Sequence, residues 1–157
     1  MTEPRWLTDD EMRAWLAYRR MRNLLDLQIN RDLAADAGLS EQDYDVLSTL
    51  SELPEPQLRV GELSDRLGWS RSRLSHHMAR MERRGLVIRE DYPGAGRGAV
   101  VKLTETGARA VREAAPGHVA SVRRHLIDRL SAEEIRVLGD IGEKVLKPLA
   151  DGSSDDA

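Results

Sequence analysis

The stretch Glu62-Leu63-Ser64-Asp65-Arg66-Leu67-Gly68-Trp69-Ser70 decides the local fold, because a short helical pattern stops at a glycine and a new one starts at a serine. An arginine-rich amphipathic run follows to Arg84. Then come Gly85-Leu86-Val87-Ile88, a glycine-rich tip with Arg97, and Ala99-Val100-Val101-Lys102-Leu103. This order predicts two short helices that meet at a tight turn, followed by a β-hairpin with a cationic tip.

Such a layout is that of a winged helix-turn-helix, whose second helix fits the DNA major groove. The distribution of charge supports this prediction. The chain of 157 residues has 24 basic and 27 acidic residues, yet segment 59–102 has 10 basic and 5 acidic ones. The remainder therefore has 14 basic and 22 acidic residues. A basic segment inside an acidic protein is expected where one surface meets phosphate.

The arginine-rich helix has an apolar stripe and a polar face. At 100° per residue, Leu74, Met78 and Met81 share the stripe, which we expect in the core. The opposite face carries guanidinium, hydroxyl and imidazole groups that can contact bases or phosphate. The candidate DNA-binding residues are Ser70, Arg71, Ser72, Arg73, Ser75, His76, Arg80, Arg83 and, on the hairpin tip, Arg97. An ordinary solvated helix face is the alternative interpretation.

Within this set, position along the helix predicts different contacts. Residues in the first two turns, such as Arg73, are expected in the major groove. Arg80, Arg83 and the neighbouring Arg84 are expected at the DNA backbone. Arg97 is a lone cation on a narrow tip, which suits the minor groove and its negative potential.

On the N-terminal side, Thr8 is followed by three acidic residues and predicts the start of a long helix that ends near Asp36, before Gly38. Ser40 and Asp43 resemble a capping box, which predicts that the next helix begins there. A loop is predicted around Pro54 and Pro56, followed by a short helix over residues 60–67.

On the C-terminal side, Thr104 is expected to open a helix that Pro116-Gly117 kinks or interrupts and that resumes to Leu130. Ser131-Ala132-Glu133-Glu134 is a full capping box and predicts the start of a last helix. Residues 151–157 are small and acidic, which predicts a disordered tail.

Composition excludes several classes of protein. The chain has no cysteine, so it has neither disulfides nor thiolate metal sites. No apolar run approaches the roughly 20 residues that span a bilayer. The first residues, Met1-Thr2-Glu3-Pro4-Arg5, lack the apolar segment of a secretory signal. These features predict a cytoplasmic protein.

Residues 63–104, together with Leu103-Thr104-Glu105-Thr106-Gly107, resemble the MarR-type (multiple antibiotic resistance regulator) transcription factors. The Leu-Thr-x-x-Gly motif follows the wing in that family, and Arg97-Gly98 matches its wing arginine and small residue. Two residues before that arginine the family has Asp, whereas this chain has Ala95.

The resemblance implies one domain over residues 1–157, mainly α-helical with a small β-hairpin wing. Residues 40–103 would form the winged helix-turn-helix, and residues 8–36 and 104–150 the dimerisation helices. The family resemblance further implies an obligate homodimer, a pseudo-palindromic operator in duplex DNA, and a small-molecule effector site between the outer helices and the winged part. The outer helices carry enough apolar positions for such a dimer, although they could also pack on their own winged part.

Aromatic side chains with a guanidinium would suit an aromatic carboxylate or phenol. The candidate ligand-binding residues are Trp15, Tyr18, Arg22 and Tyr44. Packing in a dimer is the alternative for these side chains. No sequence motif indicates an enzyme, and no cofactor is predicted.

The histidines form no clear metal-binding pattern. His118 and His125 share a helical face but lie about 10 Å apart by helical rise. We therefore predict no metal site, although a site with one of them and nearby carboxylates stays an alternative.

The sequence as a whole favours a ligand-responsive homodimeric repressor. A ligand-independent architectural DNA-binding protein is the main alternative. A winged helix that binds only proteins is another, which the charge distribution disfavours.

Overall fold

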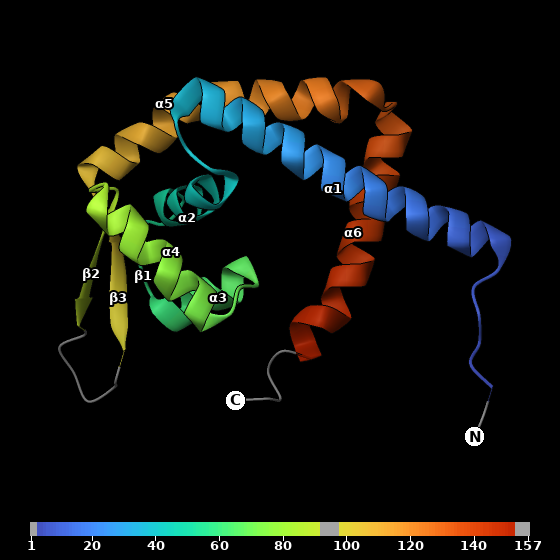
Figure 1. The fold of residues 1–157 in the computed structure, drawn as a ribbon, viewed down its shortest axis with the longest axis horizontal. Coiled ribbons are helices and arrows are strands. Elements are labelled where there is room, and N and C mark those ends of the chain that lie inside the picture. Colours follow the sequence, from blue (N-terminus) through green and yellow to red (C-terminus); the bar gives the residue numbers. More distant parts are fainter. Residues whose placement is uncertain (1–2, 92–97, 153–157) are drawn as a thin grey trace. The chain divides into compact units, whose positions relative to one another are not determined.

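The computed structural model describes residues 3–91 and 98–152, so the expected hairpin tip with Arg97 and the last five residues lie outside the described part. The elements, shown in Figure 1, are α1 (Asp9–Ala37), α2 (Glu41–Ser51), β1 (Gln57–Arg59), α3 (Val60–Leu67), α4 (Arg71–Arg83), β2 (Val87–Asp91), β3 (Ala99–Leu103), α5 (Glu105–His125), a 3₁₀ turn (Ile127–Arg129) and α6 (Ala132–Gly152). The fold is mainly α-helical with a small antiparallel sheet, as predicted.

Helix boundaries follow the local capping signals. Thr8 Oγ1 accepts from the backbone N–H of Glu11, whose carboxylate in turn accepts from Thr8 N at 2.8 Å. The same reciprocal pair joins Ser40 and Asp43, at 3.0 Å in both directions. Gly38 ends α1 at a φ of 64°, a left-handed conformation that a side chain would strain. These predicted boundaries are confirmed.

The described part of the chain contains a third strand that the sequence did not indicate. β1 pairs antiparallel with β3, with Leu58 opposite Val101, and the sheet order is β1-β3-β2. Pro54 and Pro56 led us to expect only a loop before α3. The partner strand lies more than 40 residues further along the chain, so no local pattern reports the pairing.

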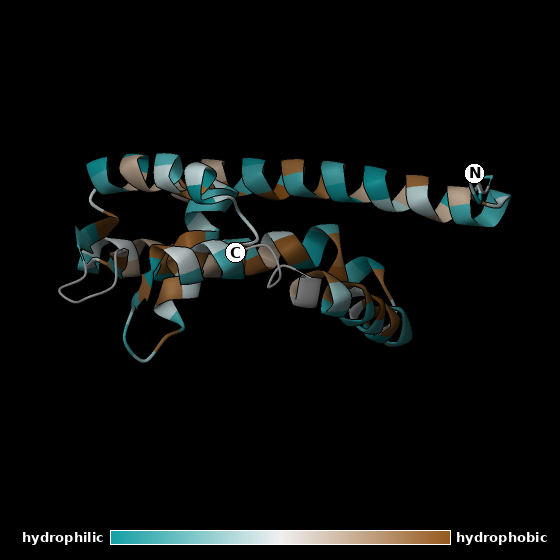
Figure 2. Ribbon diagram, turned by 90° about the horizontal axis from the view of Figure 1, so that it is seen from below, coloured by the Kyte–Doolittle hydropathy of each residue, from teal (hydrophilic) through white to brown (hydrophobic). Residues whose placement is uncertain are grey.

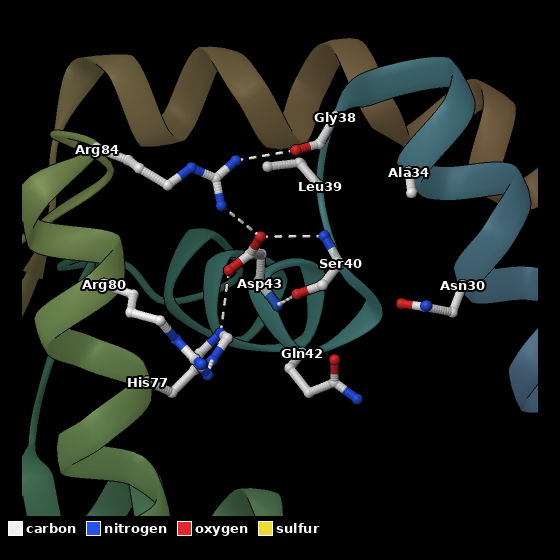
Figure 3. A pocket seen from close by; sticks show the side chains of 10 residues that line it. All are labelled: Asn30, Ala34, Gly38, Leu39, Ser40, Gln42, Asp43, His77, Arg80 and Arg84. Atoms are coloured by element: carbon white, nitrogen blue, oxygen red, sulfur yellow. Dashed lines mark hydrogen bonds and ion pairs between the residues drawn. The ribbon is translucent and has the colours of Figure 1, made fainter.

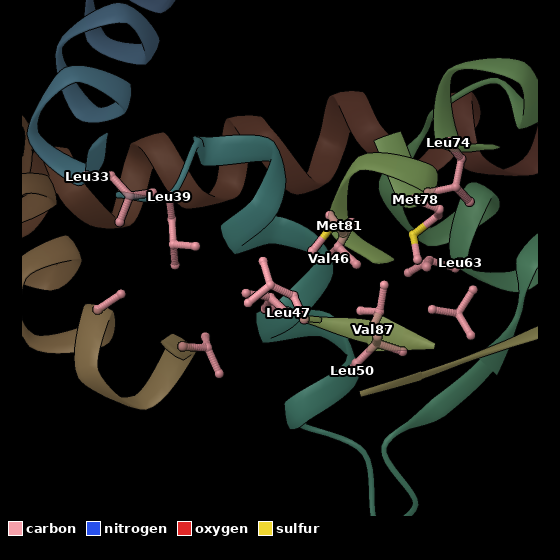
Figure 4. Close-up of a cluster of buried hydrophobic side chains, with 14 residues drawn as sticks. Leu33, Leu39, Val46, Leu47, Leu50, Leu63, Leu74, Met78, Met81 and Val87 are labelled. Atoms are coloured by element: carbon pink, nitrogen blue, oxygen red, sulfur yellow. The ribbon is translucent and has the colours of Figure 1, made fainter. Parts of the chain in front are cut away.

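The core of the winged part forms where α1, α2, α3, α4 and the sheet meet (Figure 4). The predicted α4 stripe of Leu74, Met78 and Met81 is at most 1% exposed. Opposite it, α2 contributes Leu47 and Leu50, which are fully buried. Burial of one such side chain stabilises the fold by about 1.5–3 kcal/mol. The core therefore fixes the orientation of α4 and leaves its polar face outside.

The Leu-Thr-x-x-Gly motif joins the hairpin to α5. Thr104 Oγ1 lies 2.6 Å from Gly85 O and 3.0 Å from Leu86 O, and it accepts from Gly107 N at 3.0 Å. A Cβ on Gly107 would lie 2.1 Å from Leu86 O. The motif thus needs a hydroxyl for the bridge and a glycine for the close approach of α5 to the Leu86 backbone, which precedes β2.

Pro116 does not interrupt the helix. α5 runs through it to His125, and the chain then forms a 3₁₀ turn instead of the helix expected to Leu130. Pro116 and Arg112 are both exposed, so water can hydrate the Arg112 carbonyl that proline leaves unpaired. α6 begins at the predicted capping box, where Ser131 and Glu134 bond reciprocally. It ends at Gly152, so two residues of the expected tail are helical.

The chain divides into two compact units, residues 1–119 and 120–157. In the first unit only the C-terminal part of α1 is packed, through Ile29 and Leu33. The earlier turns of α1 expose large apolar side chains. They are Met12, Trp15, Leu16, Tyr18, Met21, Leu24 and Leu27. In Figure 2 the ribbon of α1 accordingly alternates between hydrophilic teal and hydrophobic brown. α6 exposes a second apolar set, which comprises Ile135, Leu138, Ile141, Val145, Leu146 and Leu149.

Candidate nucleic-acid interface

The polar face of α4 is exposed over most of its length. Seven of the predicted residues are exposed, and Ser75 is half-buried. The exposed ones are Ser70, Arg71, Ser72, Arg73, His76, Arg80 and Arg83. Ser70 also caps α4, because its Oγ accepts from Arg73 N at 3.2 Å. Its hydroxyl hydrogen stays available to an acceptor such as phosphate.

The turn before α4 is held by two bonds between Ser64 and Trp69. Ser64 Oγ donates to Trp69 O at 2.5 Å, and Trp69 N donates to Ser64 O at 3.0 Å. Gly68 lies between them at a φ of 64°. The bonds fix the angle between α3 and α4, which is the geometric requirement of a helix-turn-helix.

Arg73 does not extend freely from the helix. Its guanidinium lies over the Trp69 ring, 4.3 Å from the ring centroid. This cation–π contact restricts the side chain while leaving the guanidinium donors at the exposed edge. The sequence analysis placed Arg73 on the polar face of α4 but did not predict that Trp69 restricts its side chain.

A buried ion-pair network joins the start of α2 to α4. Asp43 is 4% exposed, and its carboxylate lies 3.0 Å from His77 Nε2 and accepts from Arg84 Nη1 at 2.6 Å. Arg84 also donates to Gly38 O at 2.9 Å. Burial acts to raise the pKa of Asp43, but the hydrogen bonds from His77, Ser40 N and Arg84 outweigh it and hold the pKa well below its usual range.

The network changes the role of two predicted residues. Arg84, expected at the DNA backbone, instead binds Asp43 and the end of α1. Arg80 stays exposed, but its Nη2 lies 3.0 Å from His77 Nδ1. His77 is buried on the apolar side of α4. Sequence reasoning missed Asp43 and His77 as partners, because they lie on different helices and Asp43 already had a capping role.

A cavity of about 500 Å³ opens beside this network (Figure 3). In the figure, side chains from α4 face the α1–α2 junction across it. Its lining residues are Asn30, Ala34, Gly38, Leu39, Ser40, Gln42, Asp43, His77, Arg80 and Arg84. We call it the junction cavity. None of the four predicted ligand-binding residues lines it.

The structure separates those four residues into two groups. Trp15 and Tyr18 stack at 6.0 Å on α1, with the Arg22 guanidinium 5.7 Å from the Tyr18 ring centroid. Tyr44 lies on α2 against the His118 ring, at 4.2 Å. α2 begins beside Asn30, which accepts from Glu41 N. Asn30 is about 22 Å along α1 from Trp15 by helical rise. The four side chains therefore cannot line one pocket within a single protomer.

Carboxylates crowd the junction of α1 and α2. Burial, and then the nearby charges of Asp26 and Asp45, raise the pKa of Glu41 to about 7. Burial also raises the pKa of Asp45 and lowers that of His118. Among residues 3–91 and 98–152, no group of three His, Cys, Asp or Glu side chains could hold a metal ion. In the same ranges, no helix is long and apolar enough to cross a membrane.

The three-stranded sheet, the helix-turn-helix and the exposed cationic face of α4 define a winged helix-turn-helix protein of the DNA-binding, transcription-regulating class. Residues 37–98 match the model of the MarR family. The chain is similar to Sco3205, a MarR family transcriptional regulator from Streptomyces coelicolor whose crystal structure is in complex with DNA. The two are 42% identical, the match covers 95% of this chain and 93% of Sco3205, and the TM-score is 0.89. The chain belongs to the MarR family of transcriptional regulators, which are transcription factors and not enzymes.

Two further solved structures agree with this fold. AbsC, a MarR family transcriptional regulator from Streptomyces coelicolor, is 41% identical over 96% of this chain and 99% of its own, with a TM-score of 0.83. The PcaV transcriptional regulator of the same organism, in complex with its natural ligand, is 24% identical over 91% of this chain and 98% of its own, with a TM-score of 0.75. The likeness to PcaV shows a common fold alone.

Proposed function

We propose that the protein is a cytoplasmic, homodimeric and ligand-responsive repressor that binds a pseudo-palindromic operator through α4. The observation that carries the proposal is the exposed cationic face of α4, held in place by a buried apolar stripe. The DNA complex of Sco3205, at 42% identity, supports the same use of the fold. In this proposal Arg71, Arg73, Ser75 and His76 enter the major groove, and Ser70, Ser72, Arg80 and Arg83 contact its edges or the phosphates.

The homodimer is proposed from the exposed apolar faces of α1 and α6. Soluble monomers rarely expose such contiguous apolar surface, and a second copy of the chain would cover it. A symmetric dimer would place two α4 helices about one DNA turn apart, about 34 Å. Arg97, outside the described residues, is proposed to enter the minor groove beside each half-site.

The effector is proposed to bind in the junction cavity. Arg84 already neutralises Asp43, so Arg80 supplies the unbalanced positive charge of the lining. With the amides of Asn30 and Gln42, it suits a small carboxylate or phenolate. A ligand that draws Arg80 into the cavity would remove it from the DNA-facing side of α4.

The test is footprinting on the DNA upstream of the protein's own gene, with and without a panel of aromatic acids and phenols. We expect two protected half-sites one turn apart, and release of protection by one ligand class. Protection that no ligand releases would favour the ligand-independent architectural protein. Uniform protection without half-sites would contradict operator recognition.

A further inference from the structure

His77 occupies the centre of a chain of contacts that runs across α4. Its Nε2 lies 3.0 Å from Asp43 Oδ1, and its Nδ1 lies 3.0 Å from Arg80 Nη2. Its ring also meets the Trp69 ring edge-on, at 5.6 Å and 90°. The Arg73 guanidinium lies over the same Trp69 ring. One buried side chain thus contacts Arg80 directly and also contacts Trp69, on which Arg73 lies.

The partners of His77 determine where its proton lies. A guanidinium can only donate, so Nδ1 must be the acceptor for Arg80. The Asp43 carboxylate, kept ionised by Arg84, can only accept, so Nε2 must carry the hydrogen. A second proton on Nδ1 would point at the Arg80 guanidinium and remove this bond.

We infer that His77 is held as a neutral imidazole with its hydrogen on Nε2, and that in this form it positions Arg80 directly and Arg73 through Trp69. The inference rests on the proposed function of α4 in DNA recognition. His77 itself does not reach the exposed face of the helix. It acts as a positioning residue, because an arginine already held in one geometry loses less freedom when it binds a base or a phosphate.

The protonation state can be measured without DNA. In the full-length protein with ¹⁵N-labelled histidine, the two ring nitrogens of His77 should give the distinct signals of a neutral Nε2–H tautomer at pH 7. Loss of these signals in His77→Gln assigns them among the four histidines. Signals of an imidazolium, or of the Nδ1–H tautomer, would overturn the inference.

The positioning role is tested with a matched pair of variants. His77→Gln keeps one donor and one acceptor on an uncharged side chain, whereas His77→Met has comparable volume and neither group. We expect His77→Met to lower the ratio of operator to random-DNA affinity by about tenfold and His77→Gln by less than about threefold. Arg80→Ala combined with His77→Met should lose less than the two single changes together, because both act on the same contact.

The outcomes separate this inference from the proposed function. Equal operator ratios for His77→Met, His77→Gln and the unsubstituted protein would overturn the positioning role. If the unsubstituted protein does not distinguish operator from random DNA, the proposed function fails, and the histidine signals still test the tautomer. Thermal unfolding of each variant identifies loss of folding. If His77→Met does not fold, the Nδ1 signal of His77 is compared between the unsubstituted protein and Arg80→Ala, and a signal unchanged by the loss of Arg80 contradicts the inference.

Discussion

Arg84 and Asp43, which lie 41 positions apart, form a 2.6 Å ion pair that fixes the C-terminal end of α4 to the first turn of α2. The Asp43 side chain is almost fully buried, whereas that of Arg84 is 44% exposed. Asp43 is therefore removed from water, and its charge must be satisfied by its hydrogen-bond partners. The pair holds the C-terminal end of α4, which is the end remote from the turn between α3 and α4.

Asp43→Asn should destabilise the protein by about 1–3 kcal/mol at pH 7, because the buried partners lose a charged acceptor. The pKa of Asp43 is lowered on folding, so its contribution is complete above the unfolded value of about 4 and is lost as the pH falls towards the folded value. The difference between the two proteins, measured by urea unfolding, should shrink below about pH 4. Asp140→Asn, in an exposed ion pair, is the control and should have little effect at any pH.

Glu41→Gln should have the opposite pH dependence. The pKa of Glu41 is raised to about 7 on folding, so the native state binds more protons than the unfolded state between about pH 4.5 and 7. The native protein therefore loses stability through this group as the pH rises across that window. We expect the variant to unfold at higher urea than the unsubstituted protein at pH 8 and at the same urea at pH 4. A constant difference from pH 4 to 8 would contradict the raised pKa.

Gly107→Ala should destabilise the winged part, since the new Cβ would overlap the carbonyl oxygen of Leu86. The Leu86 carbonyl is backbone and cannot rotate away, so we expect a loss of about 3 kcal/mol, at the upper end of overpacking effects. Gly61→Ala is the control. A Cβ there meets only the flexible end of Arg71, at 3.5 Å. Similar melting temperatures for the two variants would show that α5 can move away from Leu86.

Arg73→Ala should weaken operator binding and relax discrimination at one base pair in each half-site. A lost bidentate contact costs about 1–3 kcal/mol, and a symmetric dimer loses two. The test is to measure the affinities of both proteins for the operator, for single-base variants of the operator and for random DNA. Equal loss on every sequence would make Arg73 a phosphate contact. Arg112→Ala, an exposed arginine of α5, is the matched control.

Ile141→Glu should disrupt the proposed homodimer, because it places a charge in the exposed apolar stripe of α6. Sedimentation should show a monomer at concentrations where the unsubstituted protein is dimeric, with operator binding weakened in parallel. Lys144→Glu puts the same carboxylate on the polar side of α6 and should leave the dimer intact. Removal of all of α1 would be a poor alternative, since Ile29 and Leu33 belong to the core.

The sequence by itself determined the features that depend on neighbours a few residues apart. The caps at Thr8 and Ser40 are bonds between positions three apart, and Gly38 and Gly68 end helices through their own backbone freedom. The apolar stripe of α4 follows from helical periodicity. These local interactions identify the long helices, the helix-turn-helix order and the exposed cationic face.

Only the tertiary structure decided which distant side chains meet. Strand β1, the Asp43 pairs with His77 and Arg84, and the junction cavity all depend on residues more than 30 positions apart. Of the aromatic residues proposed for a pocket, Trp15 and Tyr18 lie together on α1, whereas Tyr44 lies on α2 against His118. The spacing of neighbouring residues cannot predict these contacts, because the packing of the whole core sets which faces of α1, α2 and α4 come together. A buried charge such as Asp43 gains its partners only when those helices are packed.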